Sequence, residues 1–139
     1  MTYLLDANTC IQLLNSGNEG VIQRYTACRP SDVVLCSVVK AELLYGARRS
    51  SRVEFNLKRL EYFAGPLRSL AFDDRCAQDY GLIRADLAAQ GKPSGANDLM
   101  IAAIARAHDL ILVTHNTGEF SRVVGLRVED WESAHSTST

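Results

Sequence analysis

The amino-acid sequence predicts an α/β protein, a three-layer α/β/α sandwich around a central, mostly parallel sheet of four or five strands. Two observations lead to this prediction. Short apolar runs rich in Leu and β-branched residues recur along the chain, and two helical patterns separate each run from the next. Runs of this kind are typical of strands that are covered on both faces, as in a parallel sheet. The expected order is therefore strand, helix, helix, three times over, closed by a last strand.

Four apolar runs are expected to form buried strands, and a short fifth strand is left open near Leu126–Val128. The four runs are Tyr3–Leu5, Val33–Cys36, Leu67–Ala71 and Leu110–Val113. Helical patterns fill the intervals at Asn8–Asn15, Glu19–Cys28, Val38–Arg49, Val53–Ala64, Asp74–Gln90 and Asp98–Ala107. Ser37 is a favourable N-cap for the third helix. Gly65-Pro66 ends the fourth, and Gly91-Lys92-Pro93 follows the fifth.

The length of 139 residues fits one domain, expected over residues 1–132, with a low-complexity tail over 133–139 that is expected to be disordered. No apolar stretch approaches the roughly 18 residues that a membrane span requires. The charged Asp6 follows Met1 too closely for a secretory signal. We therefore expect a cytoplasmic protein with no membrane partner.

The cysteines and histidines do not predict a disulfide framework or a zinc site. The four cysteines are scattered without a Cys-x-x-Cys pair, at Cys10, Cys28, Cys36 and Cys76. A zinc site needs closely spaced ligands, and His108, His115 and His135 do not lie beside any cysteine in the sequence. The cysteines are therefore expected to act as small hydrophobic residues. Four aromatic residues are expected in the core rather than in contact with bases: Tyr3, Tyr45, Phe63 and Trp131.

The formal net charge is −1, which by itself does not indicate a nucleic-acid partner. The charges are unevenly distributed, however, because residues 40–59 carry six basic residues against two acidic ones. Arg48, Arg49 and Arg52 in this segment are candidate contacts for an RNA backbone. The alternative is a solvated basic cluster at a helix end, where cations are favoured in any case.

Three carboxylates occupy positions that are unusual for surface acids. Asp6 directly follows the first strand, and functional sites in parallel sheets form at the carboxyl ends of strands. A simple role as a helix cap is the alternative for Asp6. Glu42 shares a helix face with Val39 and Leu43, and Asp98 falls in the first turn of an Ala-rich helix beside apolar neighbours. A buried carboxylate is costly unless it is paired or binds a metal.

Converging carboxylates repel one another, and a hard divalent cation is the usual counter-charge. Mg²⁺ and Mn²⁺ prefer oxygen ligands and retain waters that can reach a phosphate. A metal held in this way can activate water and stabilise the charge on a phosphodiester. The three acids therefore indicate phosphoryl transfer or hydrolysis.

Five motifs in order carry a family resemblance that runs from about residue 3 to residue 132. They are YLLDANTC at 3–10, SVVKAELLYGA at 37–47, GANDLMIAA at 95–103, VTHNTGEF at 113–120 and GLRVEDW at 125–131. Together they resemble the motifs of the VapC-type toxins of the PIN superfamily. The resemblance implies a PIN-like nuclease fold and Mg²⁺- or Mn²⁺-dependent endoribonuclease activity. It also implies the toxin role of a type II toxin–antitoxin pair, with a cognate VapB-type antitoxin, a homodimer, and RNA, such as transfer RNA, as substrate.

Carried over by position, the resemblance makes Asp6 and Asp98 the principal metal ligands and Glu42 the third acid. Many PIN nucleases have a fourth acid where this chain has Asn116, so the fourth catalytic role is open between Asn116 and Glu119. Two alternatives to a nuclease remain. One is a receiver-like signalling domain, which would need a lysine after a late strand, and the other is a non-catalytic RNA- or protein-binding module of PIN-like fold.

Overall fold

A computed structural model describes residues 1–132, and the predicted disordered tail over 133–139 lies outside the described residues. A five-stranded sheet forms the centre of the molecule, in the order β3-β2-β1-β4-β5, and every neighbouring pair is parallel. The strands are β1 (Tyr3–Leu5), β2 (Val33–Cys36), β3 (Arg68–Leu70), β4 (Ile111–Val113) and β5 (Arg127–Glu129). The predicted sheet is therefore confirmed, including the short last strand.

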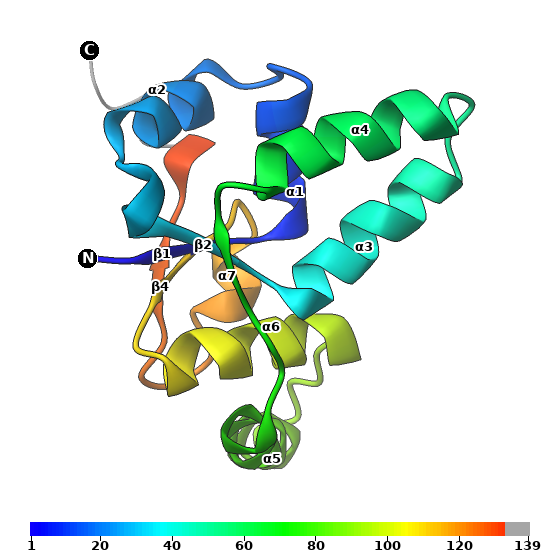
Figure 1. The fold of residues 1–139 in the computed structure, drawn as a ribbon. Coiled ribbons are helices and arrows are strands. Elements are labelled where there is room, and N and C mark those ends of the chain that lie inside the picture. The colour runs from blue at the N-terminus through cyan, green and yellow to red at the C-terminus, as the bar shows by residue number, and fades with distance from the viewer. Residues whose placement is uncertain (133–139) are drawn as a thin grey trace.

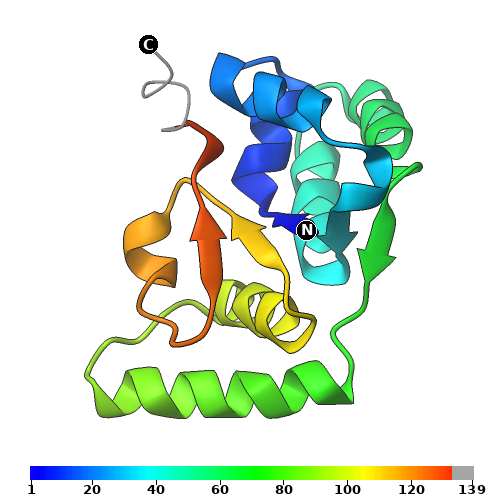
Figure 2. The same cartoon turned by 90° about the vertical axis from the view of Figure 1, so that its left-hand side faces the viewer.

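Helices cover both faces of this sheet, as the sequence predicts. In Figures 1 and 2, α5 and α6 cross and pack against each other on one side of the strands, and α1 and α2 lie on the other. The helices are α1 (Ala7–Leu14), α2 (Glu19–Ala27), α3 (Ser37–Arg48), α4 (Val53–Ala64), α5 (Asp74–Ala89), α6 (Ala96–Ala107) and the short α7 (Thr117–Phe120). A 3₁₀ turn at Pro30–Asp32 precedes β2.

The core lies between the central strands and these helices. Leu4, Leu35 and Leu112, from three adjacent strands, are fully buried. The edge strand β3 is different, since Arg68 and Ser69 are exposed and Leu70 is only partly buried. The prediction of a buried strand there was wrong, because an edge strand has a neighbour on one side only and its faces are incompletely covered.

Some helix ends differ from the predictions. Ser37 is the first residue of α3, and the N-cap is Cys36, whose side chain makes no capping hydrogen bond. The helix α6 begins at Ala96, two residues earlier than predicted, after the N-cap Gly95. The four-residue helix α7 was not predicted, because one turn is too short to produce a periodic pattern.

The aromatic predictions had different outcomes. Tyr3 and Phe63 are partly buried and pack against the core. Trp131 is 1% exposed and belongs to the core, whereas Tyr45 is 66% exposed on α3. Tyr45 instead supports the guanidinium of Arg49, whose Cζ lies 5.4 Å from the ring centroid. Among residues 1–132, no helix combines the length and apolar content needed to cross a membrane.

Candidate active site

Asp6 lies at the carboxyl end of a central strand and has both roles that the sequence left open. Its Oδ1 accepts a hydrogen bond of 2.8 Å from the backbone N–H of Thr9, so it caps α1. Its own backbone N–H donates to the carbonyl of Val113 in β4, at 3.1 Å. The cap occupies one carboxylate oxygen and fixes the side chain, and the second oxygen can still reach a ligand.

Glu42 and Asp98 reach the same place from two helices. Glu42 lies on α3 next to the buried Leu43, and Asp98 lies in the first turn of α6 next to the buried Leu99. Both carboxylate residues are partly buried. The apolar faces that hold these helices on the sheet therefore bring the two acids toward the end of β1.

The three acids line one hollow of about 320 Å³. The other residues around it are Ala7, Asn8, Ile11, Ile101, Asn116 and Phe120. The structure therefore brings together four of the five catalytic residues that the sequence indicates. The fifth, Glu119, borders the adjoining small cavity on the other side of Asp98.

Burial, and then repulsion between neighbouring carboxylates, raise the pKa values of two of these acids. Burial raises the pKa of Glu42, and the charges of Asp98 and Asp6 raise it further, while a hydrogen bond with the Asn97 side chain works in the opposite direction. Burial also raises the pKa of Asp98, followed by the charges of Glu119 and Asp6. The site thus concentrates negative charge in a partly dehydrated place, which a bound cation would relieve.

Asn116 and Glu119 form a connected pair. The Asn116 side-chain amide donates to Glu119 Oε2 at 2.9 Å, and its backbone N–H donates to the hydroxyl of the fully buried Thr114 at 3.0 Å. Asn116 therefore holds Glu119 beside Asp98. The role of Asn97 was missed, because its influence on Glu42 depends on packing between α3 and α6 and has no signal in the sequence.

The three candidate RNA-binding arginines lie outside the hollow. Arg48, Arg49 and Arg52 are all exposed at the end of α3 and in the turn before α4. Arg52 stacks on Phe55, with its Cζ 4.0 Å from the ring centroid. Within residues 1–132, none of the three arginines forms an ion pair, so their charges are available to a polyanion.

The donor set of the hollow fits a hard cation. Its polar lining consists of carboxylates and amides, and oxygen ligands of this kind are preferred by Mg²⁺ and Mn²⁺. Asp6, Glu42 and Asp98 would hold the ion.

The raised pKa values predict how pH affects stability without metal. Glu42 and Asp98 bind protons more tightly in the folded state than in the unfolded state. Their contribution to stability is therefore full below the ordinary carboxyl pKa and is lost as pH rises through the raised pKa values. We expect Asp98→Asn to melt at a higher temperature than wild type at neutral pH in chelator, and this advantage to shrink as pH falls. Thermal melts of both proteins from acidic to neutral pH measure the difference, and an advantage independent of pH would contradict the assignment.

Comparisons with known proteins show the family to which the chain belongs. The family model described as "PIN domain" matches residues 3–126. The chain is 42% identical over 131 residues to a "tRNA(fMet)-specific endonuclease VapC" of Shigella flexneri, covering 94% of this chain and 98% of the relative. It is 37% identical to "Ribonuclease VapC2" of Haemophilus influenzae, with the same coverage.

Solved structures give the same result in three dimensions. A structure of VapBC2 from Rickettsia felis, bound to a DNA fragment from its promoter, matches with a TM-score of 0.88 at 33% identity. The match covers 94% of this chain and 99% of that one. A DNA-bound VapBC structure from Salmonella typhimurium also has a TM-score of 0.88, at 39% identity, covering 94% and 98% of the two chains.

Proposed function

This chain belongs to the PIN-domain family, among its VapC-type ribonucleases, and from this premise we propose that it cleaves RNA with a divalent metal ion held by Asp6, Glu42 and Asp98. The observation that carries the proposal is the convergence of these three carboxylates in one hollow, two of them with raised pKa values. The family assignment excludes the receiver-like alternative. A non-catalytic PIN-like module would give no cleavage in the experiments below.

The chemistry divides between the metal and the protein. A bound Mg²⁺ or Mn²⁺ would supply an activated water and stabilise negative charge on the phosphodiester. Asp6 and Asp98 would be the principal ligands, and the side chain of Asp6 is already held by its hydrogen bond from the Thr9 backbone N–H. Glu42 supplies the third carboxylate, which lies beside the Asn97 side chain. Phe120 and Ile101 supply apolar lining beside these groups.

Transfer RNA is the proposed substrate class, and initiator transfer RNA is the first member to test. The proposal rests on relatives from Shigella flexneri and Salmonella typhimurium whose names describe tRNA(fMet)-specific endonucleases. The purified protein should be incubated with total RNA and Mg²⁺ or Mn²⁺, and the new RNA ends mapped. We expect cleavage at a small number of positions in transfer RNA. Intact transfer RNA beside a cleaved RNA of another class would contradict the substrate, and no cleavage of any RNA would contradict the nuclease.

Glu119 is proposed as the fourth carboxylate, in place of Asn116. Its charge raises the pKa of Asp98, and the Asn116 amide holds it in place. We expect Glu119→Gln to lower the rate of RNA cleavage about 10–100-fold, the range typical of residues that support metal ligands. Glu54→Gln, an exposed acid on α4, serves as the matched control. Equal rates of RNA cleavage by the two variants would show that Glu119 has no role in catalysis.

The exposed arginines are proposed to hold the RNA backbone. For Arg48→Gln/Arg49→Gln/Arg52→Gln we expect weaker RNA binding and a shallower dependence of log K on log salt. Each lost phosphate contact should reduce the slope by about 0.7 for single-stranded RNA. Affinities across a salt series in Ca²⁺, which is expected not to support cleavage, measure the effect. Equal affinity and parallel plots of log K against log salt would mean that the arginines do not contact RNA and are only favourable charges at a helix end.

A cognate VapB-type antitoxin is the proposed partner, because structural relatives are VapBC complexes. An apolar groove of about 620 Å³ between α1, α2 and α4 offers a docking surface, and Tyr62 on it is 87% exposed. The antitoxin complex should cleave RNA more slowly than the free chain, and an undiminished rate would contradict inhibition.

We also propose that the chain forms a homodimer. Light scattering at micromolar concentration would test this, and a monomer would contradict it.

A further inference from the structure

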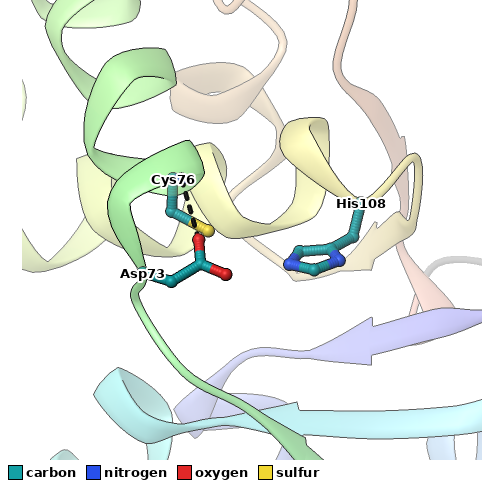
Figure 3. A group of neighbouring side chains, drawn as sticks. All are labelled: Asp73, Cys76 and His108. Atoms are coloured by element: carbon teal, nitrogen blue, oxygen red, sulfur yellow. Dashed lines mark hydrogen bonds between the residues drawn. The ribbon is translucent and has the colours of Figure 1, made fainter.

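A second group of potential metal ligands lies apart from the carboxylate hollow. It consists of Asp73, Cys76 and His108, each of which offers a ligand atom within 4.8 Å of the other two (Figure 3). Asp73 and Cys76 belong to the start of α5, and His108 follows the last residue of α6. Asp98 lies near the opposite end of α6, ten residues away, which corresponds to roughly 15 Å along the helix.

The sequence predicted no zinc site, because no histidine lies beside a cysteine along the chain, but the fold places His108 near Cys76 in space. They are far apart in the chain, and only the packing of α5 against α6 brings them together. Cys76 was also expected to act only as a small hydrophobic residue. It is fully buried, as that expectation requires, but its sulfur faces two polar groups of the cluster.

The three side chains keep donor atoms available. The cap of α5 uses only Asp73 Oδ1, which accepts from the backbone N–H of Cys76 at 3.1 Å. The Cys76 thiol lies 3.9 Å from the carbonyl oxygen of Ala71 and also hydrogen-bonds with the Asp73 side chain, so two of the three potential ligands already contact each other. Among residues 1–132, no hydrogen bond reaches the imidazole ring of His108. Figure 3 shows that ring turned toward the Asp73 carboxylate.

The spacing is close to that of a tetrahedral metal centre. Zinc bonds of about 2.0–2.3 Å place neighbouring tetrahedral ligands roughly 3.3–3.8 Å apart. The three potential ligand atoms lie within 4.8 Å of one another, so they would have to move closer by about 1 Å to bind zinc. Asp73 is exposed and His108 is only partly buried, so their side chains can make this movement while Cys76 stays fixed in the core.

We propose that Asp73, Cys76 and His108 bind a zinc-like divalent transition metal, with a water molecule as the fourth ligand. Sulfur and imidazole donors select such metals, whereas the oxygen-lined hollow at Asp98 selects Mg²⁺ or Mn²⁺. On binding, the Cys76 thiol releases its proton to solvent and its sulfur bonds to the metal. The metal then links the start of α5 to the end of α6. The exposed Arg75 beside the cluster donates to the Ala107 carbonyl oxygen at that helix end.

Cobalt(II) is the probe that distinguishes this cluster from the hollow. The full-length chain carrying Asp6→Asn/Asp98→Asn, which weakens the hollow as a metal site, is stripped of metal and titrated with Co²⁺. We expect one Co²⁺ per chain, sulfur-to-cobalt charge-transfer absorption and the intense d–d bands of tetrahedral coordination. Zn²⁺ should displace the Co²⁺ and raise the melting temperature, because a ligand that binds only the folded state stabilises it.

Three further substitutions in this background decide the assignment. Cys76→Ser should abolish the charge-transfer band, and the surface change His108→Gln should weaken Co²⁺ binding at least tenfold. Cys28→Ser, which removes a thiol elsewhere, should leave the charge-transfer band and the Co²⁺ affinity unchanged. His108→Gln keeps the test valid if Cys76→Ser folds poorly. The proposal is overturned by a missing sulfur-to-cobalt band in the parent, by a band that persists in Cys76→Ser, or by unchanged affinity in His108→Gln. None of these measurements requires RNA cleavage.

Discussion

Replacing Asp98 with Asn is expected to lower the rate of RNA cleavage by about 10²–10³-fold or more at saturating Mn²⁺. A metal centre supplies several kcal/mol of transition-state stabilisation, and each 1.36 kcal/mol lost lowers the rate about tenfold. Asp98 is close enough to Asp6 and Glu119 for their charges to raise its pKa, so replacing it weakens the proposed metal site directly. We expect Asp6→Asn to have an effect of the same order. Single-turnover cleavage of the mapped substrate measures both rates.

The matched control separates loss of chemistry from loss of fold. In metal-free buffer, Asp98→Asn should melt at or above the wild-type temperature, because the change removes a repelling charge at nearly constant volume. Glu54→Gln, which also neutralises an acid but lies on the exposed side of α4, should cleave at the wild-type rate. Wild-type cleavage by either Asp98→Asn or Asp6→Asn would refute the proposed metal site.

Replacing Trp131 with Ala is expected to lower the free energy of unfolding by about 3–5 kcal/mol, as for other large aromatic residues removed from a core. Trp131 is 1% exposed and packs edge-to-face on Tyr3, with ring centroids 5.4 Å apart. Its indole N–H donates to Glu129 Oε1 at 3.1 Å, and the same oxygen pairs with Arg24 at 2.8 Å. The indole therefore joins the edge strand β5 to β1 and α2.

Trp131→Phe is the control for this prediction. It keeps most of the apolar contact and removes only the indole N–H and part of the volume, so we expect a clearly smaller loss. Denaturant unfolding of the two variants measures both changes. A loss below about 0.5 kcal/mol for Trp131→Ala, within the range of ordinary surface substitutions, would mean that Trp131 does not hold β5 in place.

The sequence alone determined the order of the main elements and the three acids that line the hollow, and it left the fourth role open between Asn116 and Glu119. The central strands β1 and β2 have the predicted bounds, because their apolar runs are short and end at helix-start residues. Asp6 was found from its place at the end of β1. Glu42 and Asp98 were found because each interrupts an apolar helix face, which is a local property of the chain.

Only the tertiary structure decided which groups meet. The exposure of β3, the contact of Asn97 with Glu42 and the meeting of Cys76 with His108 all depend on how helices pack across the sheet. Periodicity tells which face of a helix is buried, but not which residue of another helix lies opposite it. Side chains that are distant in the chain become neighbours only when the core fixes the relative position of their helices, and for that reason the second ligand cluster left no signal in the sequence.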